Sequence, residues 1–123
     1  MREIKFRAKS ITGEWVYGNF IHSKRFQGCS NEFRVHDQET GLESDIIIET
    51  LGEFTGLKDK IGVDIYEGDI FHLGDKNIKY QVTFQNGYFG GTQVDNKSRV
   101  GLFFWSKNVE ITGKIYENSE LLR

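Results

Sequence analysis

A clean alternation of apolar and polar residues over 78–84 constrains the fold more than any other stretch of the sequence. Successive side chains of a strand point to opposite faces, so this period is that of a half-buried strand. Asn86-Gly87 follows, the pair most typical of a two-residue β-hairpin, and residues 88–92 form the returning strand. We therefore predict a hairpin here. We expect three side chains of its apolar face to be largely buried: Tyr80, Val82 and Phe84.

A second predicted hairpin opens the chain. Residues 2–8 alternate, a turn that contains Gly13 follows, and residues 15–21 form the partner strand. Further strands are predicted at 32–37, 69–73 and 109–116. Residues 46–48 are three isoleucines, which indicates a strand buried on both faces. Residues 50–54 continue that strand, or a single helical turn at 48–53 replaces the continuation.

The composition supports a mainly β protein. The 123 residues include 14 Gly and no Pro, so turns are built from Gly, Asn and Asp, and no strand is interrupted by Pro. Ten Phe, five Tyr and two Trp can supply much of the core. The length fits one ordinary domain or two small lobes.

Two turns are predicted within residues 54–70. Residues 58–62 are polar and end in Gly62, which can adopt a positive φ. Glu67-Gly68-Asp69 is the second turn, and its glycine lets the backbone bend sharply into the next strand. We interpret the acidic residues of this stretch as solvated turn residues, because the regular ligand spacing of an EF-hand loop is missing.

This stretch resembles the YopX-like family of small bacteriophage and prophage proteins. Residues 4–8 resemble the opening of the family's sequences, and residues 109–122 resemble their closing segment. Two positions depart from the family pattern: Lys9 stands in place of a Trp, and Ile61 in place of an Asn. The motif residues within 54–70, with a structural role, are Gly56, Leu57, Lys58, Asp59, Tyr66, Glu67, Gly68 and Asp69.

The resemblance implies a β-rich fold with an SH3-like barrel in its C-terminal part. We therefore expect an N-terminal β-hairpin lobe over residues 1–48 and an SH3-like small barrel over residues 49–123. The resemblance implies no enzymatic activity and no catalytic residue. Residues 26–43 follow no family pattern.

Charge and cysteine content exclude several classes of function. The formal net charge is −2, whereas proteins that bind nucleic acid through phosphates usually carry a basic excess. Cys29 is the only cysteine, which rules out an intramolecular disulfide and agrees with a reducing cytoplasm. The N-terminus lacks the apolar core of a signal peptide, and no apolar run approaches the roughly 20 residues of a membrane span. The three histidines are scattered, so no metal site and no cofactor are expected.

Two surfaces are candidates for binding. The first is a nucleic-acid surface, the alternative function, on which cations lie near aromatic residues: Lys24, Arg25, Arg34, Lys97 and Arg99. The second, which we favour, is a protein interface at Leu102, Phe103, Phe104 and Trp105.

In a strand, half of these four apolar side chains would face outward, and exposed apolar patches commonly mark interfaces. The N-terminal lobe shows only one obvious hairpin to cover them. We therefore expect a non-catalytic cytoplasmic protein that forms a homo-oligomer, with a phage or host protein as a further possible partner.

Overall fold

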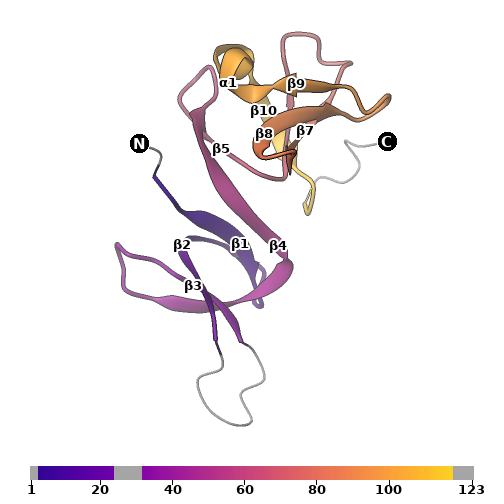
Figure 1. Cartoon of the computed structure of the whole chain (residues 1–123). Coiled ribbons are helices and arrows are strands. Elements are labelled where there is room, and N and C mark those ends of the chain that lie inside the picture. Colours follow the sequence, from indigo (N-terminus) through magenta and orange to yellow (C-terminus); the bar gives the residue numbers. More distant parts are fainter. Residues whose placement is uncertain (1–2, 24–31, 118–123) are drawn as a thin grey trace. The chain divides into compact units, whose positions relative to one another are not determined.

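The computed structural model describes residues 3–23 and 32–117, and strands make up most of it (Figure 1). Contacts divide the chain into two compact units, Met1–Phe54 (unit 1) and Thr55–Arg123 (unit 2). The sequence placed this division after residue 48, which lies inside the long strand β4 (Glu43–Lys58).

The strands of unit 1 close into a ring. Besides β4 they are β1 (Phe6–Ser10), β2 (Trp15–His22) and β3 (Phe33–His36). Each neighbouring pair is antiparallel: β1 with β2, β2 with β3, β3 with β4, and β4 again with β1. The first hairpin and the third strand are confirmed. The ring goes further than the predicted hairpin lobe, because β4 returns to pair with β1.

A bulge in β4 makes this return possible. Arg7 faces Gly52 and Lys9 faces Ile47, so two steps along β1 correspond to five along β4. The hydroxyl of Thr50 occupies the gap: it accepts a hydrogen bond from the Lys9 N–H (2.8 Å) and donates one to the Ile47 carbonyl (2.6 Å). The side chain thus replaces ladder hydrogen bonds where the strand bends.

The core of unit 1 is small. Ala8, Val35 and Ile46 are buried, and four half-buried side chains pack against them: Val16, Phe20, Phe33 and Leu51. The prediction of a strand over residues 46–54 is confirmed, and the alternative of a helical turn at 48–53 is wrong. The predicted burial of residues 46–48 on both faces is wrong, since Ile47 is 40% exposed.

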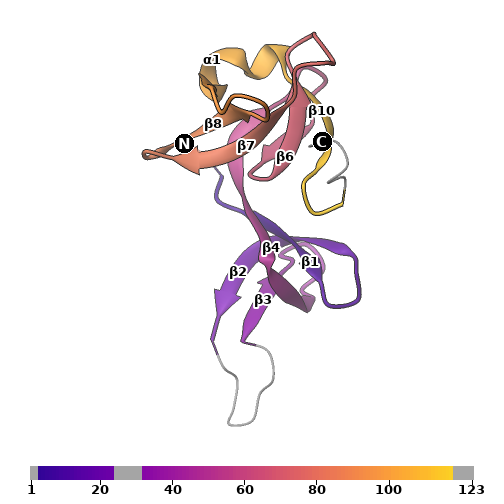
Figure 2. The same ribbon diagram turned by 90° about the vertical axis from the view of Figure 1, so that its right-hand side faces the viewer.

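Unit 2 contains the second sheet. Its elements are β5 (Asp64–Tyr66), β6 (Asp69–His72), β7 (Tyr80–Gln85), β8 (Tyr88–Gln93), β9 (Arg99–Gly101), α1 (Leu102–Trp105), the 3-10 helix η1 (Ser106–Asn108) and β10 (Glu110–Lys114). β5 pairs with β4, and the sheet order is β10-β6-β7-β8-β9. Figure 2 shows β10, β6, β7 and β8 side by side. The last strand, β10, follows the short helices α1 and η1 and pairs with β6, the first strand of this sheet. This is the arrangement of an SH3-like barrel, as predicted. Its core consists of Ile65, Phe71, Val82, Leu102 and Val109.

The hairpin β7–β8 is confirmed. Asn86 and Gly87 both have positive φ, 55° and 84°, as a type I′ turn requires. Val82 is fully buried, but the predicted burial of Phe84 is wrong, since its side chain is 53% exposed. The reason is that β6 pairs with β7 only as far as Gln81, so Phe84 lies where the hairpin extends past its neighbour.

The apolar run 102–105 is the main correction to the predicted elements. It forms the single-turn helix α1, not a strand. The helix has no side-chain cap, and one turn gains little from helix propensity. Its stability comes from Leu102, which is completely buried in the core of unit 2.

Candidate functional site

The residues of the family motif build two turns. Asp59, which is buried, forms the first: its carboxylate accepts hydrogen bonds from the N–H groups of Ile61 (3.0 Å) and Val63 (2.9 Å). Gly62 has the predicted positive φ, 91°. The exposed Lys58 pairs with Asp64 at 2.6 Å beside this turn, and Leu57 packs against the core of unit 2.

The second turn uses Asp69 in the same way. This side chain is 1% exposed, and its carboxylate accepts the N–H of Tyr66 at 2.8 Å. Gly68 has a φ of 94° and donates its N–H to the Val82 carbonyl at 3.0 Å. Glu67 lies between Tyr66 and Gly68 in the sequence. Gly56, which has a φ of 87°, precedes the first turn.

The carboxylates of Asp59 and Asp69 therefore hold the backbone of the two turns. The interpretation of Asp69 as a solvated turn residue is wrong, because its side chain is buried. In residues 3–23 and 32–117, no three His, Cys, Asp or Glu side chains lie close enough together to hold a metal ion. No helix of this part of the chain is long and apolar enough to cross a membrane.

The predicted nucleic-acid residues that the structure describes are divided between the two units. Lys24 and Arg25 lie outside the described residues. Arg34 belongs to unit 1 and is buried, and its guanidinium donates to Glu43 (3.2 Å) and to the Ser23 carbonyl (2.9 Å). Lys97 is exposed in the turn between β8 and β9.

Arg99 is also held by the fold. Its guanidinium donates to the carbonyl (3.0 Å) and hydroxyl (3.1 Å) of Thr83, and to the hydroxyl of Thr92 (3.3 Å). It also lies 4.6 Å from the centre of the Tyr88 ring. These contacts tie β9 across β8 to β7, and most of the donors of Arg99 are thereby occupied.

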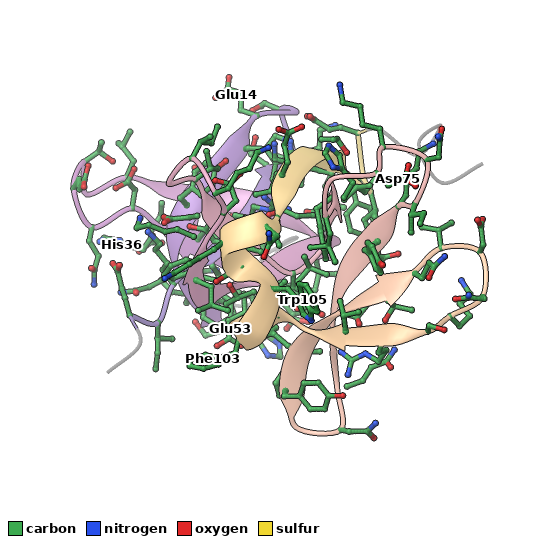
Figure 3. The ribbon with its side chains drawn as sticks, turned by 90° about the horizontal axis from the view of Figure 1, so that it is seen from above. Glu14, His36, Glu53, Asp75, Phe103 and Trp105 are labelled. Atoms are coloured by element: carbon green, nitrogen blue, oxygen red, sulfur yellow. The ribbon has the colours of Figure 1, made fainter. Side chains whose placement is uncertain are left out.

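The predicted interface residues lie together in sequence but point in different directions. Leu102 faces the core, whereas Phe103 is 75% exposed and Trp105 is 46% exposed. Residues two apart on an α-helix are separated by about 200° around its axis, and Figure 3 shows Phe103 and Trp105 on different sides of α1. Nothing is described for the side chain of Phe104.

A third group of residues was not predicted. His72 and Glu110 are direct cross-strand partners on β6 and β10, although they lie 38 positions apart in the sequence. The imidazole Nε2 is 2.8 Å from one carboxylate oxygen of Glu110, and the Lys60 ammonium is 2.9 Å from the other. The hydrogen bonds from Lys60 and His72 lower the pKa of Glu110 below its ordinary value.

The second nitrogen of His72 fixes the direction of this hydrogen bond. Nδ1 accepts the Gly74 N–H at 3.0 Å, so in the neutral ring the proton is on Nε2 and is donated to Glu110. Beside these groups is a cleft of about 270 Å³, lined by Phe71, His72, Lys76, Lys79, Glu110 and Thr112. No motif in the sequence marks this cleft, because strand pairing alone brings its residues together.

The comparisons with known proteins agree with the fold. The sequence model of the family described as YopX protein matches residues 5–123. Among solved structures, the chain is similar to the crystal structure of protein EF1440 from Enterococcus faecalis, with a TM-score of 0.60, 21% sequence identity and full coverage of both chains. This similarity shows a shared fold. No match is found among the curated proteins.

Proposed function

The chain belongs to the YopX family, and we propose that it is a non-catalytic binding protein of a phage or prophage. It works in the cytoplasm of the bacterial host by associating with a second copy of itself. The observation that carries this proposal is the exposure of Phe103 on a helix that is anchored beside it by the buried Leu102.

The exposed surface of Phe103 is large enough to matter energetically. At 75% exposure, a Phe side chain leaves about 150 Å² in contact with water. Burying that area is worth about 4 kcal/mol at about 25 cal/mol per Å². Aromatic side chains that fill a pocket in the partner are common anchors of protein interfaces.

Further apolar side chains lie on a neighbouring segment. Ile61 is 74% exposed and Val63 is 46% exposed, both in the first motif turn. A hydrogen bond of 3.0 Å from the Lys60 N–H to the Val109 carbonyl joins this turn to the end of η1, the helix that follows α1. Two adjacent segments of unit 2 thus present apolar side chains to the solvent.

Charge favours a second copy as the partner. With a net charge of −2, two copies repel each other weakly, and proteins near zero net charge associate readily. In a two-fold symmetric dimer the same surface meets itself, so each apolar side chain contributes twice.

Sedimentation velocity at micromolar concentrations tests the proposal. We expect the unmodified chain to sediment as an oligomer and Phe103→Ser to shift it toward the 14.2 kDa monomer. Phe84→Ser is the matched control, because it removes another exposed Phe, on the hairpin β7–β8, and is expected to leave the assembly intact. Trp105→Ser, tested separately, shows whether the other side of α1 contributes. A monomeric unmodified chain at about 100 μM would refute self-association.

A further inference from the structure

The cleft beside β6 and β10 has a charge distribution that points to a ligand. Two of its lining residues are lysines, Lys76 and Lys79, and within the described part of the chain neither makes an ion pair. Lys79 is only half exposed, and its carbonyl accepts the Val94 N–H at 2.9 Å, which fixes its backbone.

The acidic group of the cleft is already neutralised. Both carboxylate oxygens of Glu110 are occupied, one by the Lys60 ammonium and the other by the Nε2 of His72. The other nearby acid, Asp75, does not line the cleft; its carboxylate accepts the Asn77 N–H at 2.9 Å within the loop. The charges that remain available at the cleft are therefore those of the two lysines.

We propose that this cleft binds a phosphate group carried by a small phosphate monoester. Two ammonium groups supply up to six N–H donors and two positive charges, which match a dianionic phosphate. The volume of about 270 Å³ is slightly below that of pockets for drug-sized ligands, so it suits a small phosphate monoester. The buried ring of Phe71, which stacks on Tyr80 with centroids 5.2 Å apart, gives the cleft a rigid wall.

The cleft and the self-association surface are built from different residues. Lys76 and Lys79 lie on the connection between β6 and β7, whereas Phe103 lies on α1. Either proposal can therefore fail without affecting the other.

Amide NMR spectra of the full chain provide the test. Inorganic phosphate, phenyl phosphate and a single-stranded oligonucleotide without terminal phosphates are added separately, at neutral pH and at a constant ionic strength maintained with chloride. We expect saturable shifts of the Gly74, Asn77 and Thr112 amides with the first two probes. No saturation up to about 10 mM, or saturation with the oligonucleotide alone, would overturn the proposal.

Two charge-matched variants separate the cleft from general attraction to lysines. Lys76→Gln combined with Lys79→Gln is expected to weaken phosphate binding about tenfold or more. Lys97→Gln combined with Lys107→Gln removes the same charge from exposed positions outside the cleft and is expected to change binding less than about twofold. Equal weakening by both variants would mean that an adventitious ion only is bound, and would refute the site.

The substitution Glu110→Gln is expected to strengthen phosphate binding, whereas the lysine substitutions weaken it. It removes a negative charge from the cleft wall and releases the Lys60 ammonium from its ion pair. Phosphate binding is expected to tighten about threefold, since one unit charge a few ångströms away contributes at that level in water. Weaker binding in a variant whose spectrum is still that of the folded chain would contradict the proposed position of the ligand.

Discussion

Gly91 on β8 provides a sharp test of the core of unit 2. It lies on the sheet between Val82 of β7 and Val100 of β9, and its missing side chain leaves room for the ring of Phe71. A Cβ atom at this position would overlap the Cζ of Phe71 and lie 3.0 Å from its Cε1 and 3.3 Å from a methyl group of Val100. The substitution Gly91→Ala therefore forces the ring to move.

The ring has little freedom to do so. Phe71 is completely buried and stacks on Tyr80. Inserting a methyl group into such a core costs about 1–3 kcal/mol. Reduced entropy of the unfolded chain returns about 0.4–1 kcal/mol, because φ at Gly91 is one that Ala can adopt. We therefore expect a net destabilisation of about 1–2 kcal/mol.

Urea unfolding, followed by the fluorescence of Trp105 in a Trp15→Phe background, reports on unit 2 because the chain has only two tryptophans. Phe71→Leu shortens the side chain where the overlap occurs. Combining it with Gly91→Ala should cost less than the sum of the two single changes, by about 1 kcal/mol. A loss below about 0.5 kcal/mol for Gly91→Ala, or strict additivity of the pair, would refute this account of the packing.

Four other substitutions test separate features by urea unfolding. For Gly18, which lies in unit 1, the probe is Trp15 in a Trp105→Phe background. Phe84→Ala is expected to cost about 1 kcal/mol and Val82→Ala about 2 kcal/mol, because only Val82 is fully buried; the reverse order would contradict the exposure of the hairpin end. Gly18→Ala is expected to cost about 3 kcal/mol, since its Cβ would overlap the backbone carbonyl of His36, which cannot rotate away as a side chain can; a near-neutral effect would show that β2 and β3 are not so close. The folded-state pKa of Glu110 is lowered, so its carboxylate stabilises the fold above the unfolded value of about 4.5, and this contribution is lost as the pH falls through the folded value. Glu110→Gln should therefore lower the unfolding midpoint at neutral pH but not at strongly acidic pH, and an equal loss at both would refute the linkage.

Local turn chemistry and alternation were sufficient to predict much of the fold. Asn-Gly between two alternating segments strongly favours a type I′ turn, so the hairpin could be predicted without knowledge of its neighbours. The exposure of Phe84 could not, because it depends on where β6 ends. That boundary is a property of tertiary pairing and leaves no trace in the alternation of β7.

Residues 102–105 are a second case in which the sequence pattern alone does not determine the structure. Four large apolar residues suit a buried strand or a buried helical turn equally well, and periodicity does not separate the two in so short a run. The burial of Leu102 decides in favour of the helix. The cleft beside His72 and Glu110 could not be predicted from the sequence either, since it depends on the register of two strands that are far apart in sequence.

The ring of unit 1 has a consequence for the order of folding. The hairpin β1–β2 closes a loop of a few residues, whereas the contact between Lys9 and Thr50 joins positions 41 apart. Closing the longer loop costs about 2 kcal/mol more in chain entropy than closing a turn of about four residues. We therefore expect the hairpins to form early and the β1–β4 seam to form last, after the rate-limiting step. Loss of the Thr50 hydroxyl would then accelerate unfolding and leave the folding rate almost unchanged.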